Sequence, residues 1–144
     1  MLSKPDLCRA CPLWQTGKGW VPDEIVEDAP VFILAQNPGQ EEEAAGKPMV
    51  GKTGQYQEAA FFPVAGLERG INVSIGNVLR CRWQRSNTLP PEPTLTEAIA
   101  CCKQHLKIPK SVRLVVAEGA LAWRALGGTG SVTEWRGQLK TTVS

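Results

Sequence analysis

The chain has 144 residues, of which 42% are hydrophobic and 21% charged, as in an ordinary globular protein. This length accommodates one domain with its own core, so we expect residues 1–144 to form a single domain. No run approaches the roughly 20 apolar residues of a membrane-spanning helix, which excludes such a helix. The start of the chain also lacks an apolar signal core, so we expect a cytoplasmic protein with no membrane partner.

The formal net charge of +2 is small, but the charges are unevenly distributed. Residues 23–43 contain acidic side chains and neither Lys nor Arg, whereas residues 80–113 are mainly basic. A cationic stretch on a nearly neutral protein indicates a local anionic partner, for which the backbone of a nucleic acid is one candidate. The alternative is a solvated basic face of a helix.

The cysteines predict a metal site. An odd number of cysteines without a signal sequence argues against a disulfide framework, and the two-residue spacing of Cys8 and Cys11 favours metal binding. Cys81 would supply a third thiolate, and either Cys101 or Cys102 the fourth. Four such ligands suit both structural zinc and an iron-sulfur cluster.

The pattern of strands and helices predicts an α/β protein. Three strands alternate with helices, which indicates a three-layer α/β/α fold with a central, mostly parallel sheet. The expected strands are 31–35, 71–78 and 112–117, with a last one within 132–144. The expected helices are 54–69, 94–107 and 119–126. We expect the first to be kinked or ended at Pro63, with Gly70 as its stop. We expect the second to begin with a capping box of Thr94 and Glu97.

The first strand, 31–35, ends at a polar turn, Asn37-Pro38-Gly39. Open parallel sheets bind their ligands beyond the carboxyl ends of the strands, so an amide side chain at this place is a candidate for chemistry.

The segment 46–53 also fits the P-loop pattern, in which backbone N–H groups cradle phosphates and Lys52 reaches the terminal one. The sequence around it disagrees with this interpretation. A P-loop follows its strand directly, whereas three glutamates at 41–43 precede Gly46, and Pro48 removes one N–H donor. Because the pattern itself matches, a P-loop nucleotide hydrolase stays as an alternative, but not as the favoured interpretation.

The stretch 35–54 resembles the first motif of the iron-sulfur, or family 4 type, uracil-DNA glycosylases. Five further motifs occur in the family's order along the chain, and they bring nearly the whole chain into the resemblance. They are Cys8 and Cys11-Pro-Leu, Gly76-Asn-Val-Leu-Arg-Cys81, Ile99 with Cys102 and Leu106, and Ala117-Glu-Gly with Ala122, while Arg136-Gly137 matches a late Arg-Gly pair.

The resemblance implies an enzyme of DNA repair that flips uracil out of single- or double-stranded DNA and hydrolyses its N-glycosidic bond. It also implies a 4Fe-4S cluster held by Cys8, Cys11, Cys81 and Cys102, with zinc as the alternative cofactor. Cys101 is then a small core residue.

The resemblance assigns roles to single residues. Asn77 would read the edge of uracil with its amide donor and acceptor, and Met49 stands where the family has a Phe that stacks on the base. Glu42 occupies an acidic position of the family. Gln36 replaces the family's Glu, so Asn37 is expected to place the water, with Gln36 assisting. The residues expected to contact DNA phosphates are Lys47, Lys52, Arg82 and Arg85.

One motif of the family is missing. Its His-Pro-Ser loop has no counterpart before Ser144, and we expect His105 to be a solvated surface residue. Since one lost donor costs about 10²- to 10³-fold in rate, activity would be weak or impaired. We therefore expect a domain that is truncated at its C-terminal end. It would act as a monomer or as part of a larger replication or repair protein. The alternative is a non-catalytic nucleic-acid-binding relative with an iron-sulfur cluster.

Overall fold

The computed structural model describes residues 2–84 and 88–138. Among these residues, no helix is both long and apolar enough to cross a membrane.

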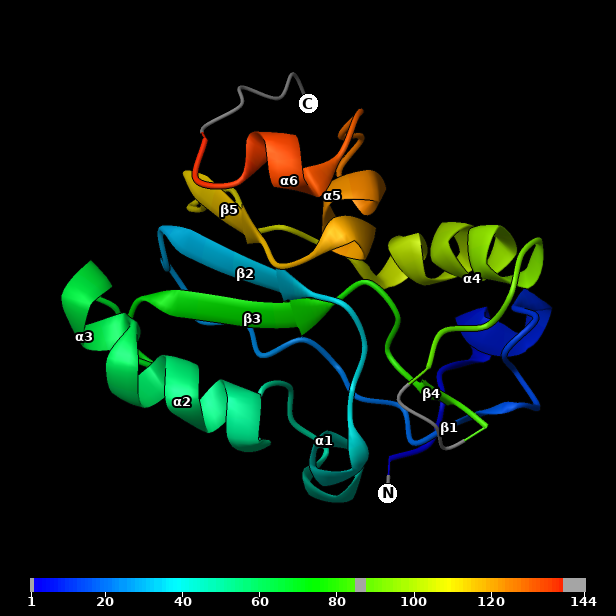
Figure 1. The fold of residues 1–144 in the computed structure, drawn as a ribbon. Helices are drawn as coiled ribbons and strands as arrows, with labels where there is room; N and C mark the ends of the chain where they lie inside the picture. Colours follow the sequence, from blue (N-terminus) through cyan, green and yellow to red (C-terminus); the bar gives the residue numbers. More distant parts are fainter. Residues whose placement is uncertain (1, 85–87, 139–144) are drawn as a thin grey trace.

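A three-stranded parallel sheet forms the centre of the protein (Figure 1). It consists of β2 (Val31–Ala35), β3 (Val73–Asn77) and β5 (Leu114–Ala117), in the order β3-β2-β5. The prediction of three strands is confirmed, although the last two are shorter than expected. The predicted burial of the third strand was wrong: β5 is an edge strand whose Leu114 and Val116 side chains remain 42% and 37% exposed. Since β2 pairs with both neighbours in the same direction, the carboxyl ends of all three strands meet at one edge.

Two apolar clusters cover the two faces of this sheet. Phe32 and Leu34 face one cluster, which includes buried side chains of α4 (Thr94–Cys102) and α5 (Ala120–Ala125). Ile33 points to the other cluster, with Phe62 of α3 (Phe62–Ala65). Because successive side chains of a strand point to opposite faces, the continuous apolar run of β2 serves both layers.

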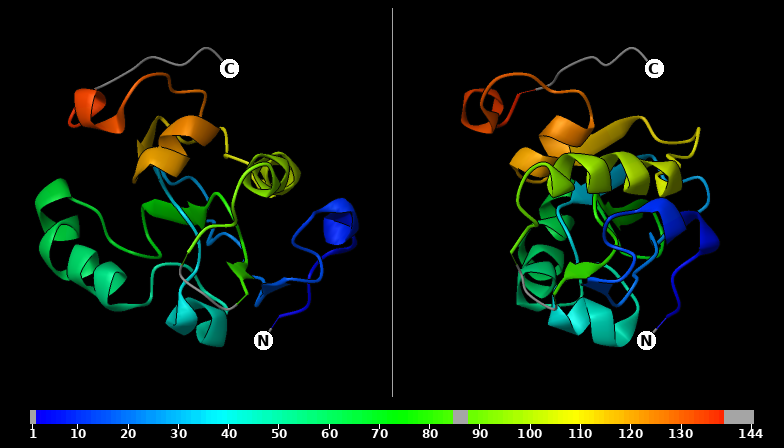
Figure 2. Two further views of the ribbon diagram at one scale, coloured as in Figure 1. Left: turned by 45° about the vertical axis from the view of Figure 1, so that its right-hand side comes forward. Right: turned by 90° about the vertical axis from the view of Figure 1, so that its right-hand side faces the viewer.

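The helices accordingly lie in two outer layers, as the predicted α/β/α architecture requires. α2 (Lys52–Ala60) and α3 lie on one side of the sheet, and α4 and α5 lie on the other (Figures 1 and 2). A short helix, α1 (Gln40–Ala45), connects β2 to the loop before α2 and was not predicted.

The cysteine-containing segments form a lobe beside α4. The 3-10 helix η1 (Asp6–Ala10) lies next to α4, which continues into the 3-10 helix η2 (Lys103–His105). Strands β1 (Gly17–Lys18) and β4 (Arg82–Trp83) pair antiparallel at its base, where the sequence predicted only irregular connections.

Several predicted boundaries were wrong for local reasons. The helix after Gly54 breaks at Phe61 rather than Pro63, since Pro63 fits the first turn of α3, and it stops at Gly66 rather than Gly70. Thr94 makes no capping box, because Pro93 precedes the helix and the Glu92 carboxylate accepts the Thr96 N–H instead. The segment expected to hold a last strand contains the helix α6 (Val132–Trp135), while 139–144 lie outside the described residues.

Candidate active site

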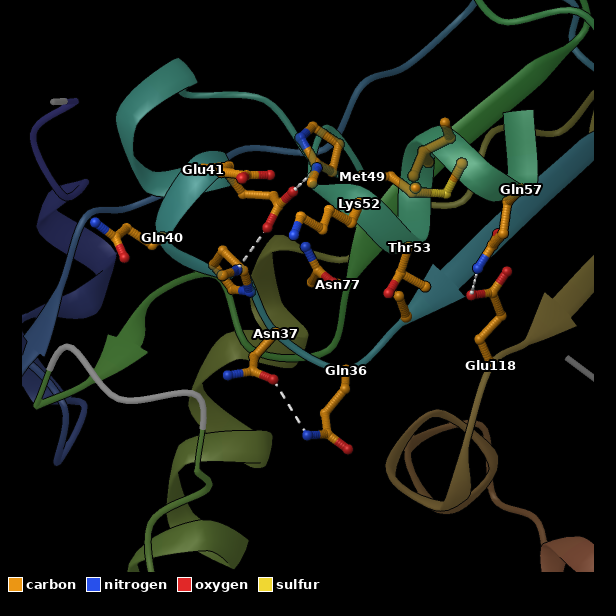
Figure 3. A pocket seen from close by; sticks show the side chains of 18 of the residues that line it. Gln36, Asn37, Gln40, Glu41, Met49, Lys52, Thr53, Gln57, Asn77 and Glu118 are labelled. Atoms are coloured by element: carbon orange, nitrogen blue, oxygen red, sulfur yellow. Dashed lines mark hydrogen bonds between the residues drawn. The ribbon is translucent and has the colours of Figure 1, made fainter. Parts of the chain in front are cut away.

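A pocket of about 860 Å³ opens at the carboxyl ends of β2 and β3 (Figure 3). Its lining brings together both strand ends, the loop after β2, helix α1 and the start of α2. Five of the residues predicted for catalysis and base binding line it, namely Gln36, Asn37, Glu42, Met49 and Asn77. These residues are up to 41 positions apart in the chain, and the parallel pairing of the strands is what joins them.

Asn77 is the last residue of β3 and has only 4% of its surface exposed. It pairs in register with Ala35, the last residue of β2. Among the described residues, no group serves as a hydrogen-bond partner for its side chain, although it lines the pocket. A buried amide costs free energy unless its donor and acceptor are satisfied, so this side chain is suited to a planar polar ligand.

Asn37 follows two residues after β2 and is held by its neighbour. The Gln36 side-chain N–H donates to the Asn37 side-chain oxygen over 3.2 Å (Figure 3). This bond orients the Asn37 amide and leaves the oxygen a second lone pair for a water molecule. Pro38, which is fully buried, fixes the direction in which the chain leaves the strand.

Glu42 holds the loop and is not free for chemistry. Its carboxylate accepts hydrogen bonds from the backbone N–H groups of Gly39 and Val50, each over 2.9 Å, and from that of Gly51. These bonds join the turn after β2 to the start of α2. They also contradict the P-loop interpretation, because the N–H groups that would cradle phosphate already bind a carboxylate, and a helix instead of a strand leads into Gly46.

Met49 lies on the pocket wall in an unusual backbone conformation. Its φ of 56° is in the left-handed region, which costs a non-glycine residue about 1–2 kcal/mol. A side chain at Gly54 would collide with it, since an added Cβ would lie 2.3 Å from the Met49 carbonyl oxygen. The absence of a side chain at Gly54 therefore allows the Met49 backbone to lie at this position. Met49 also packs against the apolar cluster that includes Val73 and Ile75 of β3.

The pocket contains polar groups that the sequence analysis missed. Glu118, directly after β5, lines it and accepts a hydrogen bond of 2.8 Å from the Gln57 side chain of α2 (Figure 3). The family's Ala-Leu-Gly reads Ala117-Glu118-Gly119 here, so a carboxylate at a strand end was the available signal. Thr53 also lines the pocket.

The four predicted phosphate contacts fall in different places. Lys52 lines the pocket at the start of α2, and Lys47 is exposed outside the pocket lining. Arg82 is only 8% exposed, because it forms a buried ion pair of 2.8 Å with Glu43. This pairing disfavours the phosphate contact expected for Arg82. Arg85 lies outside the described residues.

Cys11, Cys81 and Cys102 belong to one buried cluster of the core. Cys8, Cys11, Cys81 and Cys102 are all buried, and all five cysteines of the chain are free thiols. Burial raises the pKa of Cys81 to about 12, and the thiols of Cys8, Cys11 and Cys102 add to that rise. Gly17 leaves the space that Cys81 needs, since an added Cβ would lie 2.5 Å from its sulfur.

This donor set fits a cluster with four thiolate ligands from three segments of the chain. Within the described part of the chain, no three His, Cys, Asp or Glu residues gather closely enough to hold a single metal ion. Cys101 is partly buried and packs against the core, as expected.

His105 is not the solvated residue that we expected. It is partly buried, and its Nε2 lies 3.3 Å from the Cys8 sulfur, with the Trp20 ring edge-on at 5.8 Å between centroids. Burial lowers the pKa of His105, and the nearby Arg80 lowers it further. The contact places it in the cysteine lobe and not among the residues that line the pocket.

A buried ion pair connects this lobe to the sheet. The Arg80 guanidinium donates to the Cys102 carbonyl oxygen over 3.0 Å and to the Asp23 carboxylate over 2.7 Å. Asp23 in turn packs directly over Gly76 of β3, one residue before Asn77. The cysteine lobe is thus attached to the strand end that carries Asn77.

Fold and site together define an α/β protein with a partly polar pocket at the carboxyl edge of a parallel sheet and, apart from this pocket, a lobe with buried cysteines. Comparison with protein families matches residues 22–143 to the uracil DNA glycosylase superfamily. The chain belongs to this superfamily.

Three relatives named type-4 uracil-DNA glycosylase illustrate the similarity. That of Pyrobaculum aerophilum is 35% identical over 83% of this chain and 59% of its own length. That of Sulfurisphaera tokodaii is 35% identical over 69% of this chain and 42% of its own, and that of Thermotoga maritima is 29% identical over 90% and 67%. The chain thus spans about half the length of the first two.

Proposed function

We propose that this chain binds DNA containing uracil and hydrolyses the N-glycosidic bond of that nucleotide. The observation that carries the proposal is the placement of Asn37 and Asn77 at neighbouring strand ends, facing one pocket in a chain of this superfamily. The two amides correspond to the two tasks of the reaction, which are to recognise the base and to place a water molecule.

Asn77 supports base recognition. The edge of uracil offers carbonyl oxygens and an N–H group, so an amide can donate to one and accept from the other at the same time. Because Asn77 is buried, a base lacking this pattern would leave its amide unsatisfied, at a cost of about 1–3 kcal/mol for each lost hydrogen bond. Met49 would pack against the ring and exclude water from it.

Asn37, oriented by Gln36, would accept a hydrogen bond from the attacking water. In the reaction, the bond between the sugar C1′ and the base nitrogen breaks, and its electron pair leaves with uracil. The water oxygen bonds to C1′ and releases a proton, which balances the negative charge of the departing uracil anion. Since neutral amides are weak bases, bond breaking should run ahead of water attack, with positive charge on the sugar. Glu118 provides a pocket carboxylate that could stabilise this charge.

The cysteine lobe supports a structural cofactor. We propose that Cys8, Cys11, Cys81 and Cys102 hold a 4Fe-4S cluster, which would supply a rigid crosslink between η1, β4 and α4. Through Arg80 and Asp23, that crosslink would stabilise the end of β3 where Asn77 lies. Zinc remains the alternative for the same thiols.

Lys52 at the pocket and the exposed Lys47 are the proposed phosphate contacts.

We further propose that residues 1–144 act as one domain on DNA in the cytoplasm, as a monomer or as part of a larger replication or repair protein.

Incubation with a labelled single-stranded oligonucleotide containing one uracil, followed by alkali treatment, tests the proposal. We expect cleavage at the uracil position, no cleavage of the matching thymine oligonucleotide, and loss of cleavage in Asn77→Ala. Absence of cleavage by iron-replete protein at micromolar concentration would refute the catalytic proposal.

A second candidate is a non-catalytic relative that binds uracil-containing DNA. Two observations favour it: the neutral Gln36 at the family's carboxylate position, and the placement of His105 beside Cys8. In the same experiment it predicts selective retention of the uracil oligonucleotide without alkali-sensitive sites.

A further inference from the structure

Arg69 lies behind the pocket wall and binds the loop that carries Met49. Its Nη1 donates to the Met49 carbonyl oxygen over 2.6 Å, and its Nη2 donates to the Pro48 carbonyl oxygen. Both acceptors belong to residues that line the pocket, whereas Arg69 itself does not line it. One planar guanidinium thus holds two consecutive carbonyl groups, which a lysine could not do with the same geometry.

The loop is held from its other side by Glu42. This carboxylate accepts the N–H groups of Val50 and Gly51, the two residues after Met49. Between the carbonyls bound by Arg69 and the N–H groups bound by Glu42, Met49 has its φ of 56°. A strained conformation of this kind persists only where the surrounding structure enforces it, and these two charged side chains provide that enforcement.

The position of Arg69 is itself fixed to the sheet. Its Nε donates to Glu24 over 2.9 Å, and only 14% of its side chain is exposed. Glu24 exchanges backbone hydrogen bonds with Ile75 of β3, two residues before Asn77. The clamp on Met49 and the amide of Asn77 are therefore built on the same strand.

We propose that Arg69 is a positioning residue that sets base selectivity by holding Met49 in its left-handed conformation at a set distance from Asn77. This inference rests on the proposed function of the pocket. It assigns the recognition of the base to two surfaces, the Asn77 amide of β3 at the ring edge and the Met49 side chain of the loop before α2 at the ring face.

The test is a double-mutant cycle of Arg69→Gln and Met49→Gly. Glycine adopts a positive φ without strain, so the loop of Met49→Gly does not need the clamp. We expect Arg69→Gln alone to lower kcat on uracil DNA about tenfold with little change in KM, and to reduce the preference for uracil over thymine. In the Met49→Gly background the same substitution should change kcat less than threefold. Equal losses in both backgrounds would overturn the proposal.

Hydrogen exchange provides a readout that does not depend on catalysis. Amides of residues 49–51 should exchange about tenfold faster in Arg69→Gln than in the parent protein, and Arg69→Lys should be intermediate. Arg113→Gln, which removes an exposed arginine before β5, is the matched control and should leave these rates unchanged. Unchanged rates in Arg69→Gln would also overturn the clamp.

The two readouts separate this inference from the proposed function. An inactive parent protein with faster loop exchange in Arg69→Gln refutes the glycosylase and supports the clamp. An active parent protein whose selectivity and exchange are unaffected by Arg69→Gln supports the glycosylase and refutes the clamp. If Arg69→Gln fails to fold, Glu24→Gln, which removes the charge that orients the guanidinium, takes its place with the same expected results.

Discussion

Asn77 pairs in register with Ala35, so the last residue of β3 lies beside the last residue of β2. Asn37, two positions beyond Ala35, consequently lines the same pocket as Asn77. This relationship turns two amides that are 40 positions apart into one site, and it leads to separate predictions for each.

Replacing Asn77 by Ala should lower kcat/KM on uracil DNA about 100-fold. Two hydrogen bonds to the base would be lost, and 100-fold corresponds to about 2.7 kcal/mol. Steady-state kinetics on a single-stranded uracil oligonucleotide measure this. Gln15→Ala, at an exposed position outside the pocket lining, serves as the control. A loss below threefold in Asn77→Ala would show that the base binds elsewhere.

Replacing Asn37 by Ala should instead lower kcat about 10²- to 10³-fold and leave KM nearly unchanged. The reason is that a group which orients the water acts on the reaction step and contributes little to ground-state binding. Single-turnover rates with excess enzyme separate this effect from binding. An increase in KM with an unchanged single-turnover rate would transfer Asn37 to a binding role.

Glu118→Gln should lower kcat about tenfold, which corresponds to about 1.4 kcal/mol. A carboxylate in the pocket stabilises positive charge on the sugar, and the neutral amide of nearly the same shape does not. Rates and DNA affinity are to be measured together. Tighter DNA binding with an unchanged kcat would mean that Glu118 faces a phosphate and repels it.

Glu42→Gln should reduce the free energy of unfolding by about 1–3 kcal/mol. The carboxylate accepts three backbone N–H groups, and an amide in its place must turn an NH₂ group toward one of these donors. Chemical denaturation of the variant measures the change. Glu41→Gln removes the same charge from the neighbouring exposed position and should stay within about 0.5 kcal/mol.

Protein purified without oxygen should contain about four iron and four sulfide per chain. Cys81→Ser should lose most of this iron, because a buried proposed ligand is removed. Cys101→Ser should keep the parental content, since Cys101 is not among the proposed ligands. Stoichiometric zinc in the parent protein would instead identify the alternative cofactor.

Much of this protein could be predicted from local sequence. Apolar runs rich in β-branched residues predicted the strands at 31–35 and 112–117, because such residues favour strands, although only the first is buried on both faces. The spacing of Cys8 and Cys11 indicated a thiolate site, and the strand-end position of Asn37 indicated a ligand pocket. These features depend on periodicity and on neighbours in the chain, which a sequence displays directly.

Only the tertiary structure decided what the charged residues do. Arg82 and Arg80 looked like surface cations, but they are buried against Glu43 and Asp23, whose positions depend on packing across about 40 to 60 residues. Glu42 and Arg69 hold the Met49 loop, and Glu118 enters the pocket, for the same reason. A long charged side chain has no intrinsic preference for one partner, so its role follows from which opposite charge or backbone group the completed fold places within reach.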